Sequence, residues 1–235
     1  MSQDTNYDSF AEAYAAENES SLLNAYYERP AMIELVGNVH NRRVLDAGCG
    51  SGPLAEALID RGATVTGFDL SGEMIELARK RLGEDVELLT GDLRQPLPFE
   101  DDTFEDVVAS LVFHYLEDWV SPLKEVRRVL RPGGRLILSV NHPILYPWNN
   151  PGTDYFEPTR YSDDLTFNGQ PATLTYWHRP LHAMTQAFAQ AGFQIEVVSE
   201  PPYSPDTPPE LVPEKLRDRK SFLSFIFFVL RAEQG

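Results

Sequence analysis

The sequence predicts an α/β fold in which helices flank a doubly wound, mostly parallel sheet. Three observations support this prediction. From residue 43 onward, short apolar runs alternate with longer amphipathic segments, and parallel strands require such crossover connections. A glycine-rich loop, GCGSG, follows the first apolar run and leads into a helical segment, where open α/β sheets usually bind ligands. A chain of 235 residues can form one sizeable domain with a cap or insertion.

The expected helices begin with two segments that precede the alternation. Residues 9–24 carry small and apolar side chains among acids, and Pro30 opens a second helix that runs to about residue 40. In a later helix, Ser71 fits the N-cap and Gly83 the stop. The later helices are expected over residues 53–61, 71–82, 120–130 and 180–191.

The expected strands end in a pair that departs from the parallel pattern. No helical pattern separates the last two strands, and their connection is rich in proline. This arrangement predicts a terminal antiparallel pair. The strands are expected over residues 43–47, 64–68, 86–90, part of 104–111, 135–141, 193–200 and 221–232.

A segment rich in proline and aromatic residues interrupts the alternation between His142 and Arg179. It contains five prolines and eight aromatic residues. A structureless loop of this length is uncommon in a compact domain, so we expect a cap with short strands of its own. The single domain then divides into an N-terminal helical segment, a core, the cap, and a C-terminal helix with its strand pair; their residues are 1–40, 41–142, 143–179 and 180–235.

Composition excludes several classes of partner. The formal net charge of −16 would repel phosphate backbones, so we expect no nucleic-acid or membrane partner. Cys49 is the single cysteine and no cysteine/histidine cluster suggests zinc, so we expect no disulfide and no metal. The N-terminus lacks signal-peptide features, and the longest apolar run, 222–230, is too short to cross a bilayer. A cytoplasmic protein is therefore expected.

The glycine loop by itself fits more than one kind of ligand. Gly48 and Gly50 permit tight turning and close approach, and the helix start behind them offers free N–H groups. Asp69, about twenty positions beyond the loop, can accept hydrogen bonds from both ribose hydroxyls. Counted from Gly50, the sequence GSGPLA also spells a dinucleotide fingerprint. Nucleotides, dinucleotides, S-adenosylmethionine and an ordinary glycine turn all remain open on these residues alone.

Two further aspartates favour S-adenosylmethionine. Asp46 lies ahead of the glycines, where a carboxylate can help hold a cationic amino-acid end but would repel a pyrophosphate. No arginine or lysine lies in the loop to balance a phosphate. Asp92 follows the third strand, where it can accept from the exocyclic amine of adenine while Leu93 packs beside the ring.

Five segments together resemble a known family. VLDAGCGSG, GFDLSGEMIELAR, GDL, FEDVVASLVFHYLEDW and LRPGGRLILSV follow the order and spacing of class I S-adenosylmethionine-dependent methyltransferases. The chain is similar to the bacterial small-molecule enzymes with a bare Rossmann-like core, of the methyltransferase type 11 kind. The resemblance covers residues 43–141 closely and the terminal strand pair loosely. It implies seven strands with the last antiparallel, S-adenosylmethionine as cofactor, and S-adenosylhomocysteine as product.

The resemblance also implies roles for individual residues. The N-terminal helix would act as a lid, with Tyr14 against the cofactor and Tyr7 nearer the substrate; packing on the core is the alternative. Leu70 and Met74 would face the adenine, although either could be a core residue. The residues implied for the cofactor are Tyr14, Asp46, Gly48, Cys49, Gly50, Gly52, Asp69, Leu70, Met74, Asp92, Leu93 and Ser110, with Leu111 beside them.

The methyl acceptor leaves weaker traces in the sequence. His114 follows the fourth strand and is the candidate catalytic base, because histidine titrates near neutrality; a histidine bonded to backbone is the alternative. His142 and His178 flank the aromatic segment and could bind substrate or act as hinge residues. The substrate-binding candidates are Tyr7, His114, His142, Trp148 and His178.

We therefore expect methyl transfer to a small-molecule acceptor by in-line displacement. A nicotinamide-dependent reductase and a non-catalytic S-adenosylmethionine-binding module are the alternatives. The identity of the acceptor, the choice of O-, N- or C-methylation, and the oligomeric state, homodimer included, stay open.

Overall fold

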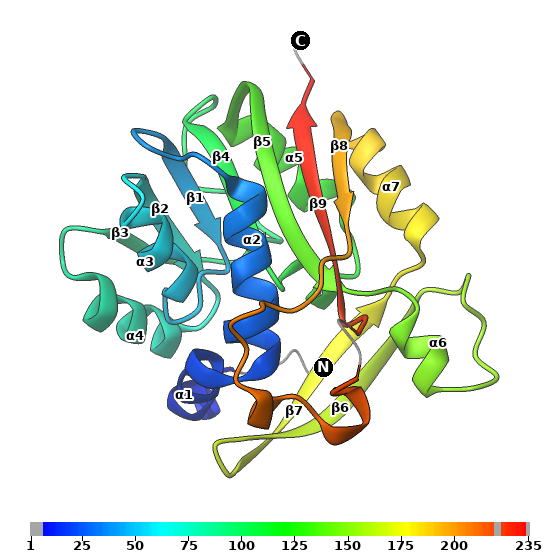
Figure 1. The fold of residues 1–235 in the computed structure, drawn as a ribbon. Helices are drawn as coiled ribbons and strands as arrows, with labels where there is room; N and C mark the ends of the chain where they lie inside the picture. The colour runs from blue at the N-terminus through cyan, green and yellow to red at the C-terminus, as the bar shows by residue number, and fades with distance from the viewer. Residues whose placement is uncertain (1–6, 219–221, 234–235) are drawn as a thin grey trace.

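A seven-stranded sheet forms the centre of the molecule. The computed structural model describes residues 7–218 and 222–233. The strand order is β3-β2-β1-β4-β5-β9-β8, and β9 runs antiparallel to both of its neighbours, as Figure 1 shows. The predicted doubly wound sheet with a terminal antiparallel pair is thus confirmed. The strands are β1 (Arg43–Ala47), β2 (Thr64–Asp69), β3 (Glu87–Thr90), β4 (Phe104–Ser110), β5 (Leu130–Asn141), β8 (Phe193–Ser199) and β9 (Phe225–Ala232).

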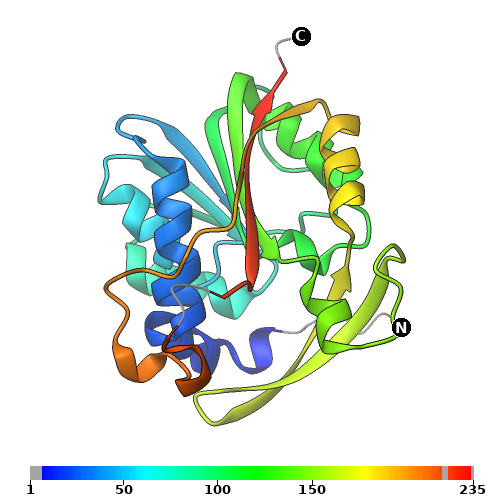
Figure 2. The same cartoon turned by 45° about the vertical axis from the view of Figure 1, so that its right-hand side comes forward.

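Helices cover both faces of this sheet because side chains alternate across each strand. In β4, Val107 packs into the apolar cluster that contains α5 and α7, whereas its neighbour Val108 packs into the cluster that contains α2 and α3. The two layers are visible in Figures 1 and 2. The longer helices are α1 (Ala11–Ser20), α2 (Arg29–Val36), α3 (Pro53–Ile59), α4 (Gly72–Leu82), α5 (Val120–Val129) and α7 (Leu181–Gln190).

The predicted helix boundaries are confirmed at α4, whereas the helix start predicted at Pro30 is wrong. Ser71 caps α4 by accepting the Met74 N–H at 3.1 Å, and Gly83 ends the helix. Pro30, however, lies inside a continuous helical run from residue 22 to residue 36. The run contains a π-helical segment at Asn24–Glu28, and it ends before Gly37 rather than near residue 40.

The π-helical segment is a local consequence of Pro30. Proline has no N–H and its ring clashes with the carbonyl four residues earlier, which here belongs to Tyr26. The wider turn frees this carbonyl, which accepts the Ser204 N–H at 2.6 Å instead. The helix start predicted at Pro30 is wrong because this compensation lets the helix continue through the proline.

The cap is a hairpin with a short helix, as the interruption of the pattern predicts. β6 (Thr159–Phe167) and β7 (Gln170–His178) pair antiparallel, and α6 (Leu145–Asn149) precedes them. The turn residues Asn168 and Gly169 both have positive φ, which suits a two-residue hairpin loop. In Figure 1 the hairpin and α1 lie at the end of the sheet toward which β1 and β2 point.

No helix within the described residues is long and apolar enough to cross a bilayer.

The opposite end of the sheet from the cap contains a buried ion pair. Asp106 of β4 is fully buried, and its carboxylate accepts from Arg135 Nε at 2.8 Å and Nη2 at 3.0 Å. Arg42 Nε lies 2.8 Å from the same carboxylate. This pairing ties β4 to β5 and to the segment that enters β1.

Asp106→Ala is expected to lower the free energy of unfolding by about 3–5 kcal/mol, because it removes the buried partner of two partly buried guanidinium groups. Urea denaturation followed by circular dichroism measures the change. Asp101→Ala is the control, since Asp101 is 74% exposed in its pair with Arg128 and should cost no more than about 1 kcal/mol. Equal losses in the two variants would contradict the structural role of Asp106.

Candidate active site

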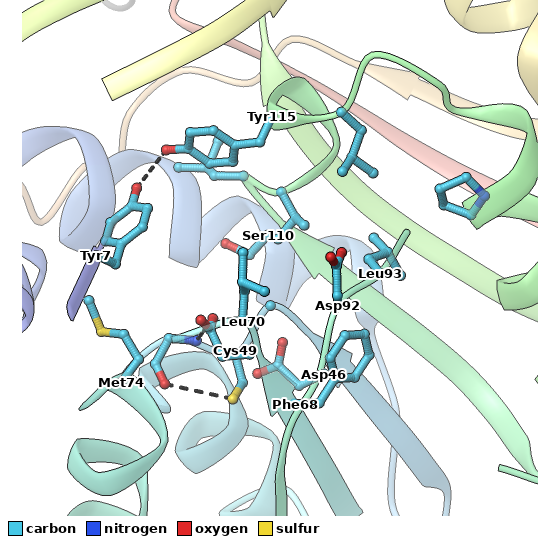
Figure 3. Close-up of a pocket in the computed structure, with 18 of the residues that line it drawn as sticks. Tyr7, Asp46, Cys49, Phe68, Leu70, Met74, Asp92, Leu93, Ser110 and Tyr115 are labelled. Carbon is cyan, nitrogen blue, oxygen red and sulfur yellow. Dashed lines mark hydrogen bonds between the residues drawn. The ribbon is translucent and has the colours of Figure 1, made fainter. Parts of the chain in front are cut away.

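A cavity of about 590 Å³ opens at the carboxyl ends of β1, β2, β3 and β4. The lid, formed by residues 7–20, and the cap hairpin also contribute to its wall. Figure 3 shows Tyr7 and Tyr115 on one side of the cavity and Asp46, Cys49 and Met74 on the other. The predicted cofactor residues that line it are Tyr14, Asp46, Gly48, Cys49, Gly50, Asp69, Leu70, Met74, Asp92, Leu93 and Ser110, together with Leu111.

The glycine loop is held tightly against the end of β2. The N–H groups of Gly48 and Cys49 donate to the Phe68 carbonyl at 2.8 and 3.0 Å. Gly48 has a φ of +78°, and a Cβ atom there would lie 2.3 Å from Val112 Cγ2. Only glycine fits this position, because any side chain would meet the segment after β4.

Asp69 connects the loop to the start of α4. Its Oδ2 accepts the Gly50 N–H and its Oδ1 accepts the Ser71 N–H, each at 2.9 Å. Burial raises the pKa of this carboxyl, and the two backbone bonds act in the opposite direction. Each carboxylate oxygen has a second lone pair, so Asp69 can still accept a hydrogen bond from a ligand in the cavity.

Asp46 is the most unusual group of the site. It is 1% exposed, and neither carboxylate oxygen has a well-aligned hydrogen-bond donor within the described residues. Burial, together with repulsion from Asp69 and Glu28, raises the pKa of this carboxyl to about 8. The Ala55 N–H acts in the opposite direction, but its effect is the smallest of the four. A buried carboxylate without donors, beside a cavity, indicates a binding position for a cation or a hydrogen-bond donor.

The far end of the cavity is partly occupied by the chain itself. Asp92 accepts from Arg94 Nε at 2.9 Å and pairs with its Nη2 at 2.8 Å. The carboxylate that we expect to read an adenine edge would therefore share its oxygens with a guanidinium. Leu93 is buried beside it, Met74 is 1% exposed, and Leu70 is 53% exposed.

Aromatic residues join the lid to the cap. The hydroxyl groups of Tyr7 and Tyr115 lie 2.5 Å apart, and the rings of Tyr7 and Tyr14 meet edge to face at 5.0 Å. Phe10 stacks on Phe167 of the hairpin at 5.8 Å. The lid thus packs on the cap while Tyr7 and Tyr14 line the cavity, and their contact with cofactor or substrate stays a prediction.

The structure gives no support to His114 as a catalytic base. His114 is buried and is not one of the cavity-lining residues. Its Nδ1 accepts the Asn141 N–H at 3.1 Å, and burial lowers its pKa to about 3. The ring is therefore neutral and its acceptor nitrogen is already used. This is the backbone-bonded alternative.

Of the other substrate-binding candidates, Tyr7 lines the cavity, whereas His142, Trp148 and His178 do not. His142 pairs with Glu200 at 2.6 Å, and His178 donates to a backbone carbonyl at 2.8 Å. Trp148 is 77% exposed. Gly52 precedes α3 and likewise does not line the cavity. Both histidines are bonded to neighbouring groups, and their role as hinge residues stays a prediction.

Several residues that line the cavity were not predicted from the sequence. Glu28 is the most deeply buried of the charged ones, at 4% exposed. No motif signals it, because the π-helical segment and the ends of β4 and β5 place it only in the folded chain. Tyr115 directly follows His114, the predicted catalytic base, so its position in the sequence could have identified it. The other residues missed include Asn18, Asn24, Arg29, Val112, Arg160, Thr175 and Trp177.

Comparisons with known proteins decide the family of the core. The family model described as "Methyltransferase domain" matches residues 45–138. This part of the chain is therefore similar in sequence to methyltransferase domains. It contains the glycine loop, Asp69, Asp92 and the end of β4.

The match to individual relatives is partial in sequence and broad in structure. An uncharacterised Haemophilus influenzae protein is 33% identical over 58% of this chain and 57% of its own length. A demethylmenaquinone methyltransferase of Renibacterium salmoninarum is 30% identical over 63% of each. The chain thus spans about three fifths of these two relatives. The solved structure of an S-adenosylmethionine-dependent methyltransferase of Mesorhizobium loti is 27% identical and has a TM-score of 0.65. The match covers 86% of this chain and 96% of that one.

Asp46→Asn is expected to stabilise the free protein, and more strongly at alkaline pH. The folded carboxyl has a pKa of about 8 against 3.8 for the ordinary group. Between these values the folded chain keeps a proton that the unfolded chain loses, so stability falls as pH rises and the loss is complete above pH 8. The free energy of unfolding of the variant should exceed that of wild type by on the order of 5 kcal/mol near pH 9 and by much less near pH 5.

Urea denaturation at the two pH values, without ligand, measures this difference. Asp85→Asn is the matched control, because Asp85 is exposed in the connection before β3 and should leave both values unchanged. A gain that is the same at both pH values would show that Asp46 is not kept protonated by the fold.

Proposed function

We propose that the protein transfers a methyl group from S-adenosylmethionine to a small-molecule acceptor. The observation that carries this proposal is Asp46, a buried carboxylate without donors beside the glycine loop. A ligand with a cationic amino-acid end supplies what this group lacks. A dinucleotide would place a pyrophosphate near it, and the repulsion would disfavour binding.

The residues of the cavity fit S-adenosylmethionine along its length. Asp46 would bind the ammonium group, Asp69 would accept from the ribose, and Leu93 with Leu70 would contact the adenine. Bound there, S-adenosylmethionine supplies an electrophilic methyl group on a sulfonium. Tyr7 and Tyr14 of the lid would cover it, since aromatic faces attract cations and exclude water.

The chain's part in the reaction is mainly positioning. In-line transfer needs the acceptor atom about 3 Å from the methyl carbon, and holding it there supplies much of the rate. The lid and the cap hairpin, which meet through Phe10 and Phe167, enclose the place for such an acceptor. The net charge of −16 disfavours nucleic acid as the acceptor, and the demethylmenaquinone methyltransferases among the relatives support a small organic one.

Isothermal titration calorimetry with S-adenosylhomocysteine tests the cofactor. We expect the wild-type protein to bind it and to ignore NAD. Asp69→Asn should weaken binding about 10- to 100-fold, because an amide accepts ribose hydrogen bonds less well than a carboxylate. Asp85→Asn should change nothing. Tight binding of NAD alone would refute the proposal in favour of a nicotinamide-dependent reductase.

Turnover separates an enzyme from a module that only binds the cofactor. The measurement is S-adenosylhomocysteine formed during incubation with S-adenosylmethionine and a panel of small aromatic acceptors. Formation that needs both an acceptor and Asp69 is the expected result. Binding without turnover on any acceptor would leave the non-catalytic module as the better description.

A further inference from the structure

Glu28 is a buried acid on the cavity wall whose role the preceding proposal does not use. It is 4% exposed and lies at the end of the π-helical segment Asn24–Glu28. Burying a carboxylate is costly unless it is bonded. Extended π-helical turns are rare and often occur at functional sites. Both the burial of the Glu28 carboxylate and the π-helical backbone next to it therefore indicate a specific role for this residue.

Two serines hold one side of this carboxylate. Ser110 and Ser139 approach Oε1 at 2.7 and 2.6 Å. The Ser139 oxygen itself accepts the Leu111 N–H at 3.0 Å, so its hydroxyl proton is directed at Glu28. Both serines thus engage Oε1, and no hydrogen bond to Oε2 is recorded within the described part of the chain.

The serines are placed by strained backbone after β4. Leu111 has a φ of +55°, a conformation that is uncommon outside glycine and costs free energy. This turn presents the Leu111 N–H to Ser139 and brings Ser110 to the same carboxylate. On the other side, Pro30 lies two residues beyond Glu28, next to the π-helical segment. Two local distortions therefore meet at this one acid.

The strand order places Glu28 beyond the cofactor residues. Asp92, Asp69 and Asp46 lie at or just past the ends of β3, β2 and β1, and the sheet continues to β4 and β5. Glu28 is bonded to the ends of these last two strands. A ligand that extends from Asp92 to Asp46 leaves the β4–β5 side of the cavity to a second molecule.

The groups around Glu28 define what this second molecule can be. The cavity wall includes Tyr7, Tyr115 and Trp177, which offer flat apolar surface. Arg29 also lines the cavity, but it donates to the Asn18 carbonyl at 2.8 Å and to the Asn18 side chain. Burial raises the pKa of Glu28, while Ser139, Ser110 and Arg29 lower it.

We propose that Glu28 binds the methyl acceptor, and that this acceptor is a planar apolar molecule presenting an O–H or N–H group to Oε2. This inference rests on the proposed function, because the cofactor must occupy the Asp46–Asp92 side. Ser139 is a positioning residue: it keeps Oε1 engaged and leaves Oε2 as the free acceptor. The aromatic wall selects the planar body and Glu28 selects the donor group.

Binding of three probes to the complex with S-adenosylhomocysteine tests this proposal. The probes are 1-naphthol, 1-naphthylamine and naphthalene, which differ only in the donor group. The wild-type complex should bind the first two at least tenfold more tightly than naphthalene. In Glu28→Gln the serines should retain the amide oxygen and leave its NH₂ toward the cavity, so the preference should fall below about threefold.

Controls separate this role from cofactor binding and from folding. Glu28→Gln should keep its S-adenosylhomocysteine affinity within about threefold of wild type, which also shows that the variant is folded. Glu28→Asp keeps the charge but withdraws the carboxylate, and should retain part of the preference. Glu34→Gln, an exposed change on the same helix, should leave every affinity unchanged.

Three outcomes would overturn the inference. A wild-type complex that binds naphthalene as tightly as 1-naphthol, or that does not bind 1-naphthol at millimolar concentration, would exclude this acceptor class. A loss of S-adenosylhomocysteine affinity above tenfold in Glu28→Gln would assign Glu28 to the cofactor instead. Failure of the wild-type protein to bind S-adenosylhomocysteine would refute the proposed function itself, which is a different result.

Discussion

Three carboxylates that line one cavity set the central constraint on this molecule. Glu28, Asp46 and Asp69 come from different elements. Glu28 and Asp46 are buried, and both Glu28 and Asp69 repel the charge of Asp46. The fold bonds two of them: Asp69 to backbone N–H groups, and Glu28 to serine hydroxyls. Asp46 has no well-aligned bond of either kind within the described residues, and the Ala55 N–H offsets little of the effect of burial on its pKa. The glycine loop, the lid and the turn after β4 are all arranged around these acids.

The opposite end of the sheet shows how the same fold treats a structural acid. Asp106 is as deeply buried as Asp46, yet Arg135 and Arg42 neutralise it. The contrast separates a carboxylate that ties strands together from one to which the proposed function gives a role in binding the cofactor. The cost of Asp46 is tolerated because two apolar layers on the sheet supply the stability of the fold.

Lid and cap behave as one covering unit because they share an aromatic cluster. Phe10, Phe167, Leu174 and Tyr176 form its buried part. Many aromatic residues of the cap are therefore its own packing surface rather than contacts for an acceptor. Tyr7 and Tyr14 of the lid pack against this same cluster.

The sequence by itself determined the core and the residues of the glycine-loop side of the cavity. Alternation of strands and helices, the glycine loop, and the aspartates at or near the ends of β1, β2 and β3 are local patterns, because each acid lies next to the end of its own strand in sequence. The surroundings of Glu28 were decided only by tertiary structure. Glu28 meets Ser110 and Ser139 across 82 and 111 positions, and burial makes His114 a neutral, backbone-bonded residue. Neither long-range contact nor burial is encoded in a short motif, so the histidines were noticed and the glutamate was not.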